Sequence, residues 1–282
     1  MNLCGRIISR FAQYQRYHCF PMYRSLKVFV VLAFVSVMVS AQTQGGGAAA
    51  GVGRVYEAAG KSTAARELQR KMNTALIRAV AREKAVARSA ADRSRPKSAR
   101  PAPMPVSPPT STDTTAFFKP DPGSNYMTAM ADQLGTTAAE KEQLRQIFAL
   151  TKEAFEKEVA AKGRSNNLPA AFTLFIATMV TVYHDDPEPS DEAVDKLWDG
   201  MSSALTEMPE LKNLTNEEKQ QMYDMLVAFS GLVLAGYTQA KMSGNAESLK
   251  VFKALSGGLI QTVLKTVPEK LRFGKGGLDI VN

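Results

Sequence analysis

The strongest candidate for chemistry in this 282-residue sequence is an acidic segment that contains a histidine. His184 is followed by Asp185, Asp186 and Glu188, with prolines at 187 and 189. Imidazole is a common zinc ligand and carboxylates bind hard cations, so one interpretation is a metal or acid–base site near His184. Neither H-E-x-x-H nor D-x-D-x-D-G spacing occurs. The other interpretation is a solvated loop, with His184 favoured by the dipole at a helix C-terminus. We assign no catalytic, cofactor-binding or metal-ligating residue.

Three further patterns each have a structural and a functional interpretation. The run from Gly274 to Gly277 lacks the spacing of a phosphate-binding loop and favours a flexible tail, and no G-x-S-x-G elbow occurs. Four polar residues of one expected helix could line a pocket or form hydrogen bonds between helices: Gln220, Tyr223, Asp224 and Tyr237. Five methionines could line an apolar groove or pack the core: Met130, Met179, Met201, Met222 and Met225.

The first 41 residues are typical of an export signal. Arg24 and Lys27 precede an apolar run at 28–39, and small side chains at 39–41 predict cleavage before Gln42. Residues 1–21 exceed an ordinary signal, so they indicate either an over-called start codon or a long n-region. Cys4 and Cys19 would be removed, leaving no thiol. We expect an exported protein, periplasmic or extracellular.

Charge divides the chain into a basic front and an acidic body. Residues 42–120 contain 14 Lys and Arg against 5 Asp and Glu, whereas residues 121–282 contain 16 against 22. Within the basic arm, residues 42–92, a Gly/Ala-rich start precedes an amphipathic helix expected at 62–91. Its thin apolar stripe is Leu68, Met72, Leu76 and Val80. This helix could lie on an anionic membrane or bind a polyanion, or could be a solvated spacer.

Proline and helix-capping patterns predict the rest of the organisation. Eight prolines within 93–122 predict an extended linker, which places the body at 123–282. Residues 168–183 carry no charge and predict a central core helix, about 24 Å long and so too short to span a membrane. The fold class is all-α, a compact bundle of about five helices, at roughly 137–161, 168–183, 190–209, 215–242 and 247–267. No sheet is expected, and 278–281 could form a short extended tail.

Several motifs of the body resemble a known group. An Asn-rich turn leads into an Ala- and aromatic-rich helix, and a later long helix carries spaced polar and small residues: Asn166, Asn167, Ala170, Ala171 and Phe172, then Gln220, Tyr223, Asp224, Gly231, Tyr237 and Ala240. From about Phe155 to Phe273 the chain resembles exported bacterial proteins catalogued as a domain of unknown function. The resemblance implies an exported all-helical domain and brings no activity. The chain departs from the group at Asn167, where the resemblance implies an aspartate.

These patterns favour an exported, non-enzymatic helical binding or scaffold domain of the cell envelope, with no cofactor. Its partner would be an envelope protein or an anionic membrane surface, contacted through the basic arm. The alternative is a metal-assisted hydrolase with a site near His184. Export argues against a nucleic-acid partner for the arm, and the sequence indicates no oligomeric state.

Overall fold

The structure is a computed structural model that describes residues 63–93, 114–274 and 277–281. The expected signal peptide with its cleavage site, the Gly/Ala-rich start of the basic arm and most of the proline-rich linker lie outside the described residues. Lys275 and Gly276 of the glycine-rich run also lie outside them.

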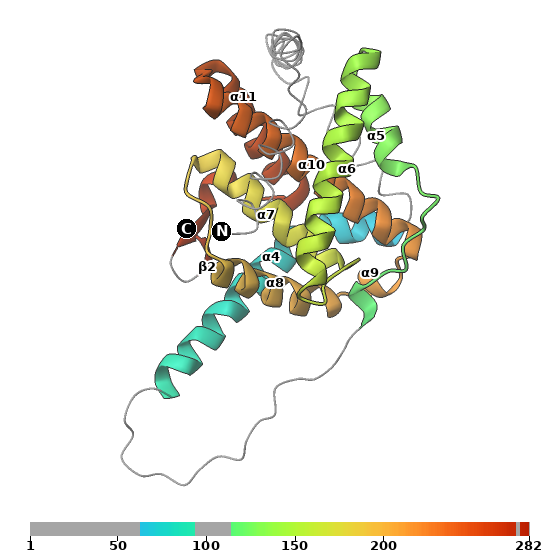
Figure 1. The fold of residues 1–282 in the computed structure, drawn as a ribbon. Helices are drawn as coiled ribbons and strands as arrows, with labels where there is room; N and C mark the ends of the chain where they lie inside the picture. Colours follow the sequence, from blue (N-terminus) through green and yellow to red (C-terminus); the bar gives the residue numbers. More distant parts are fainter. Residues whose placement is uncertain (1–62, 94–113, 275–276, 282) are drawn as a thin grey trace, which may run out of the picture.

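The predicted all-α class is confirmed, and a small β-hairpin is added (Figure 1). The elements in order are α4 (Thr63–Arg93), η2 (Thr114–Ala116), α5 (Tyr126–Leu134), α6 (Ala138–Ala160), α7 (Leu168–His184), α8 (Asp191–Thr206), α9 (Pro209–Lys212), α10 (Asn216–Ser243), α11 (Ala246–Leu259), η3 (Ile260–Leu264), η4 (Pro268–Lys270), β1 (Leu271–Gly274) and β2 (Gly277–Ile280). None of the helices in these ranges combines the length and apolar content needed to cross a membrane.

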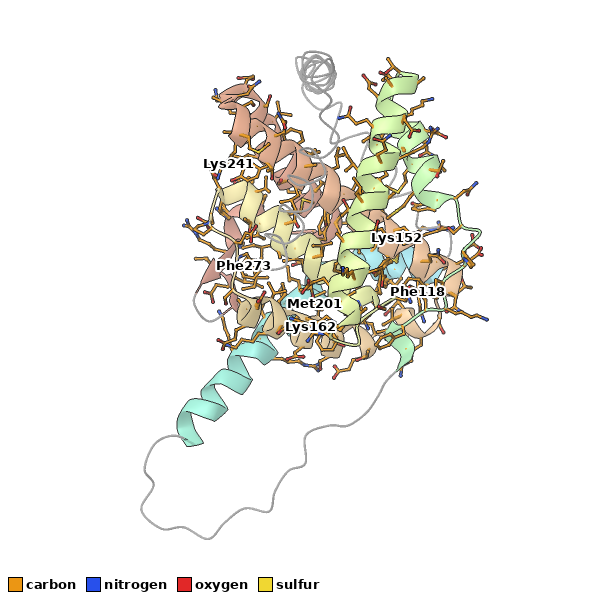
Figure 2. All side chains as sticks on the ribbon, viewed as in Figure 1. Phe118, Lys152, Lys162, Met201, Lys241 and Phe273 are labelled. Atoms are coloured by element: carbon orange, nitrogen blue, oxygen red, sulfur yellow. The ribbon has the colours of Figure 1, made fainter. Side chains whose placement is uncertain are left out.

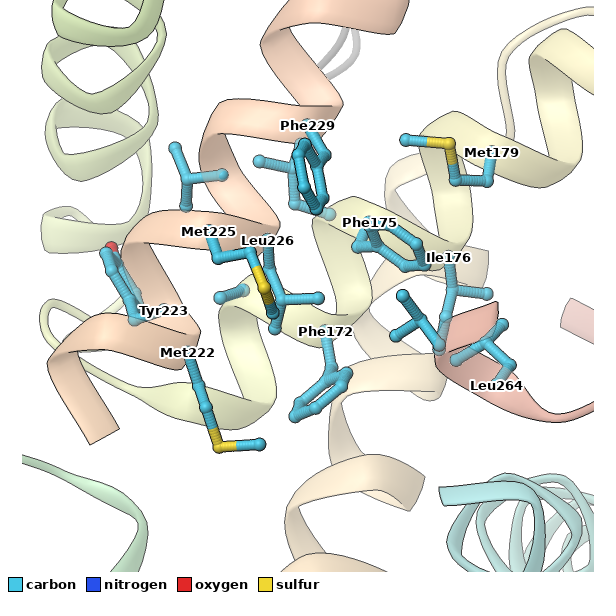
Figure 3. Close-up of a cluster of buried hydrophobic side chains, with 14 of the residues drawn as sticks. Phe172, Phe175, Ile176, Met179, Met222, Tyr223, Met225, Leu226, Phe229 and Leu264 are labelled. Carbon is cyan, nitrogen blue, oxygen red and sulfur yellow. The ribbon is translucent and has the colours of Figure 1, made fainter. Parts of the chain in front are cut away.

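Helix α7 is the centre of the bundle, as its uncharged sequence predicts. The Asn167 side chain caps it by accepting a hydrogen bond from the Ala170 N–H at 3.0 Å. Every residue from Leu168 to Val182 is buried, because α10, α11 and α8 surround the helix. Figure 3 shows aromatic and aliphatic side chains of α7, including Phe172 and Phe175, among those of α10. Burial of these apolar side chains stabilises the fold.

Helix α10 begins with a capping box and contains small residues at two helix contacts. The side chains of Thr215 and Glu218 each bond the other's backbone N–H, as the T-x-x-E spacing predicts. A Cβ at Gly231 would overlap Thr151 of α6, and a Cβ at Gly236 would overlap the Phe252 ring of α11. The two glycines therefore let α6 and α11 approach α10 closely.

The helix of the basic arm is present, but the expectation that it stands apart from the body is wrong. In α4 the stripe residues Leu68, Met72 and Leu76 have no exposed surface, because α4 packs against α8 and also against α9, η3 and β2. Their burial places α4 in the hydrophobic core. A Cβ at Gly200 of α8 would lie 2.7 Å from the Ala79 carbonyl oxygen, so the two backbones cross closely. Figure 1 shows α4 crossing α8, with its C-terminal end extending beyond the body.

The end of the predicted linker also belongs to the body. Phe118 is buried, and its N–H donates to the Asn166 carbonyl at 3.1 Å. Its ring meets Tyr223 edge to face, with 5.2 Å between centroids. The body therefore includes residues before the boundary predicted at Gly123, because Ala116 and Phe118 are part of the hydrophobic core.

The C-terminal region differs most from the expectation. The last long helix ends with the π-helical turn η3 at Leu264, earlier than the expected end at Val267. The next residue, Lys265, has a φ of 53° and so leaves the helical conformation. Strands β1 and β2 then pair antiparallel, with Leu271 opposite Ile280 and Phe273 opposite Leu278. The extended tail expected at 278–281 is thus one strand of a hairpin, whose partner strand β1 was not expected from the sequence. Each strand has only four residues, which gives too short a pattern to recognise.

Candidate functional surfaces

The His184 loop holds the C-terminal hairpin and the end of α10 together. The Nε2 atom of His184 lies 2.7 Å from the carbonyl oxygen of Leu271, the first residue of β1. The carboxylate of Asp185 is 2.6 Å from Lys241 Nζ and accepts a hydrogen bond from the Tyr237 hydroxyl. These two interactions, with Lys241 the stronger, lower the pKa of Asp185. The loop residues therefore have structural partners.

Asp186 adds a third contact between the loop and the hairpin, because its carboxylate binds the side chain of Arg272 in β1. Arg272 Nε lies 3.1 Å from Asp186 Oδ2, and Arg272 Nη2 lies 3.2 Å from Asp186 Oδ1. His184, Asp185 and Asp186 thus turn to three different partners. Within the part of the chain that the structure describes, no group of three or more His, Cys, Asp or Glu side chains is placed to hold a metal ion.

Three of the four polar residues of α10 lie at its N-terminal half and connect it to other segments. Gln220 holds the backbone of Asp121, accepting from its N–H at 2.7 Å and donating to its carbonyl at 3.1 Å. Asp224 is buried 2.6 Å from Lys152 Nζ of α6 (Figure 2), and burial raises its pKa against the opposing effect of Lys152. Tyr223 donates to Glu156 of α6. The geometry is that of hydrogen bonding between helices, while Tyr237 lies apart at the His184 loop.

The five methionines singled out in the sequence are all buried in the core. Figure 3 shows Met222 and Met225 of α10 and Met179 of α7 among neighbouring aromatic rings. Their flexible side chains fill the space between helices, which is the core-packing interpretation.

Ion pairs along both sides of α4 join the basic helix to the acidic body. Lys71 Nζ lies 2.7 Å from Glu210 of α9, and its hydrogen bond lowers the pKa of that carboxyl. Arg82 pairs with Glu207, which directly follows α8, and Lys84 Nζ lies 3.1 Å from Asp279 of β2. Part of the positive charge of the basic arm therefore pairs with negative charge of the acidic body within the same folded chain.

The side of α4 that points away from α8 is a separate surface, which we call the outer face of α4. It consists of exposed residues about one helical turn apart: Arg66, Arg70, Thr74, Ile77, Arg78 and Ala81. The side chain of Ile77 is 49% exposed, in contrast to its buried neighbour Leu76. The sequence of this helix has a basic and an apolar side, but it does not show which side remains accessible.

The Asn166-Asn167 turn of the recognised motif forms a structural corner. Asn166 adopts a φ of 53°, which asparagine tolerates better than most residues, and its carbonyl receives Phe118. The Asn167 side chain caps α7 and also accepts from Trp198 Nε1 at 3.1 Å. The motif therefore joins α6, α7, α8 and the segment after the linker, and it gives the resemblance a physical basis.

A family model with the description "Family of unknown function (DUF6683)" matches residues 25–281. The match extends well beyond the segment 155–273 on which the resemblance was based, and it includes α4. No curated protein and no solved structure matches the chain.

Proposed function

We propose that this chain, which belongs to the DUF6683 family of unknown function, is an exported, non-enzymatic binding domain of the cell envelope that docks on an anionic membrane surface through the outer face of α4. The observation that carries the proposal is the division of α4 into two sides. Its apolar stripe is committed to α8, whereas three arginines point outward: Arg66, Arg70 and Arg78.

Because the apolar stripe is already buried, this helix would lie on the membrane together with the body instead of inserting alone. Ile77 stands within the row of arginines, where a single exposed aliphatic side chain could enter the headgroup region. A basic helix face with a shallow apolar contact is typical of interfacial binding. The export pattern at 22–41 supports placement of this face in the envelope.

The expected strength follows from the charges. Each basic residue close to an anionic membrane contributes about 1 kcal/mol. Arg70 also forms an ion pair with Glu67, which reduces its share, so the three arginines contribute roughly 2 to 3 kcal/mol, or on the order of 100-fold in the partition coefficient. The interaction should weaken as salt increases, since exposed charges are screened over about 10 Å at 0.1 M ionic strength.

The test is co-sedimentation of the chain from Gln42 to Asn282 with vesicles of phosphatidylglycerol or of phosphatidylcholine. We expect binding to the anionic vesicles only, and a loss of about 100-fold for the triple variant Arg66→Gln, Arg70→Gln and Arg78→Gln. Glutamine retains good helix propensity, so circular dichroism should show an unchanged fold. The matched control removes three exposed lysines elsewhere: Lys119→Gln, Lys157→Gln and Lys250→Gln.

Equal losses in the two triple variants would show that only net charge matters and would refute a specific role of α4. Binding to neither vesicle would also overturn the membrane proposal and would move the search to an envelope protein. Deletion of the whole basic arm is not a clean test, because α4 contributes Leu68, Met72 and Leu76 to the core. Export is tested separately: the N-terminal sequence of the protein recovered from the periplasm or the medium should begin at Gln42, and recovery only from the cytoplasm would contradict it.

A further inference from the structure

Glu67 of α4 lies beside the outer face of this helix and binds two cations. Its Oε2 atom forms an ion pair with Arg70, and its Oε1 atom lies 3.2 Å from Lys71 Nζ. The side chain of Glu67 is 25% exposed, whereas that of Arg70 is 76% exposed. The carboxylate therefore lies at the edge of the outer face and is bound to an arginine that is accessible from outside.

Lys71 connects this pair to the body of the protein. Its Nζ atom also lies 2.7 Å from Glu210 of α9, so a chain of ion pairs runs from Arg70 through Glu67 and Lys71 to α9. Lys71 thus keeps an acidic partner when Glu67 is replaced. For Arg70, Glu67 is the one acidic partner within the residues that the structure describes.

Glu67 and Arg70 are both charged at neutral pH. Hydrogen bonds from Arg70 and, to a smaller extent, from Lys71 lower the pKa of Glu67. The same contact raises the pKa of Arg70. The negative charge of Glu67 therefore offsets the positive charge of Arg70 under the conditions in which the protein would meet a membrane.

Arg78 lies about two helical turns further along the outer face and has different surroundings. Its side chain is exposed, and no acidic side chain in the described parts of the chain forms an ion pair with it. Arg78 should therefore make the full contribution of a basic residue near an anionic membrane, about fivefold in the partition coefficient. Arg70 should contribute less, because it must first leave Glu67.

A phosphate group offers Arg70 the same kind of partner as Glu67 does. The guanidinium group binds carboxylate and phosphate oxygens with the same fork of N–H donors. A lipid phosphate that approaches the outer face must therefore compete with Glu67 for Arg70.

From these contacts we propose that Glu67 is an internal competitor of the lipid phosphate and limits the affinity of the outer face of α4 for anionic membranes. This inference rests on the membrane docking proposed above and adds the residue that restrains it. When a headgroup phosphate binds Arg70, the Glu67 carboxylate retains Lys71 as its partner. The affinity of the face is thus lower than it would be with Arg70 unpaired.

The test is a double-mutant cycle between Glu67 and Arg70, measured as the partition coefficient of the chain from Gln42 to Asn282 on phosphatidylglycerol vesicles. Glu67→Gln should raise this coefficient about two- to fivefold, because Arg70 then contributes in full. Arg70→Gln should lower it by less than about twofold in the parent chain, but by about fivefold in the Glu67→Gln chain. Arg78→Gln should lower it by about fivefold in both chains.

The matched control for net charge is Glu153→Gln on α6, whose main contacts are with α5 and α10. It removes the same charge at an exposed position away from the outer face, so the partition coefficient should be nearly unchanged. Glu67→Ala should behave as Glu67→Gln does, which excludes an effect of a new hydrogen bond from glutamine. The urea midpoints of both Glu67 variants check that α4 stays docked.

The outcomes separate this inference from the membrane proposal itself. Binding of the parent chain that is unchanged in Glu67→Gln, or raised equally in Glu153→Gln, would overturn the role of Glu67 alone. Equal losses from Arg70→Gln in the two chains would show that Glu67 acts only through its charge, and would also overturn the competition. Absence of binding by both the parent chain and Glu67→Gln would refute the membrane docking and this inference with it.

Discussion

Neighbouring residues of α4 should differ sharply in their contribution to stability. Leu76 has no exposed surface and faces α8, whereas the side chain of Ile77 is 49% exposed on the outer face of α4. Replacing a fully buried leucine by alanine costs about 3 kcal/mol, from lost burial and from the cavity that remains. Replacing Ile77 loses about half of a side-chain burial, about 1 kcal/mol, and regains about 0.4 kcal/mol of helix propensity.

The assay is urea denaturation of the chain from Gln42 to Asn282, followed by circular dichroism and by Trp198 fluorescence. We expect Leu76→Ala to lower the free energy of unfolding by about 3 kcal/mol and Ile77→Ala by less than about 1 kcal/mol. Both substitutions place alanine in the same helix at adjacent positions, so Ile77→Ala is the matched control. If α4 were a solvated arm, both changes would be nearly neutral. Equal, small effects at the two positions would therefore refute the docked arrangement.

Three further predictions concern helix contacts and pH. Gly200→Ala should lower the free energy of unfolding by about 1–3 kcal/mol, because the added Cβ would lie 2.7 Å from the Ala79 carbonyl oxygen. This cost should exceed the gain in helix propensity from alanine. Thermal unfolding checks the prediction, and a gain in stability would contradict it. Gly236→Ala should cost a similar amount in urea denaturation, because the Phe252 ring occupies the space, and an unchanged midpoint would show that the ring moves freely. Although burial opposes it, hydrogen bonds from the preceding threonines lower the pKa of Glu140. The ionised Glu140 side chain should therefore stabilise the fold at any pH above the pKa that it has in the unfolded chain, and this stabilisation should be lost as the pH falls through its lower pKa in the folded chain. The difference in unfolding free energy between the parent chain and Glu140→Gln should shrink between a pH of about 7 and about 3. A constant difference would refute this.

Local sequence patterns predicted much of the bundle because local forces determine them. Both capping boxes act through side chains within four residues of the helix start, so their spacing alone identifies α6 and α10. The uncharged run at 168–183 required a buried position, and α7 occupies it. Gly231 and Gly236 lie at close helix contacts, and the local sequence could not show that Thr151 and Phe252 would be their neighbours.

Long-range contacts explain what the sequence did not predict. The apolar stripe of α4 is narrow and is followed by a proline-rich segment, so locally it resembles a solvated or surface-bound helix. Its place is decided by α8, more than 100 residues away, and by Glu207 and Glu210, whose charges complement Arg82 and Lys71. The excess of acidic residues in the body is the feature of the sequence that indicates a partner for the basic helix within the same chain.

The contact between Trp198 and the start of α7 was likewise invisible in the sequence. Nothing in the local sequence links Trp198 with Asn167, which lies 31 residues earlier in the chain. One hydrogen bond between them, at 3.1 Å, joins both residues. His184 shows the opposite case: its acidic neighbours suggested one site, yet the fold directs them to separate partners.

Hydrogen exchange of the α4 amides tests the central claim most directly, namely that α4 is part of the folded body and presents only its outer face. The measurement is made on the chain from Gln42 to Asn282, in solution and on phosphatidylglycerol vesicles. We expect slow exchange for the amides of residues 68–82 in both states, comparable to that of α10, because opening them requires loss of the α8 contact. Exchange of these amides within seconds in solution, as in an isolated helix, would contradict it.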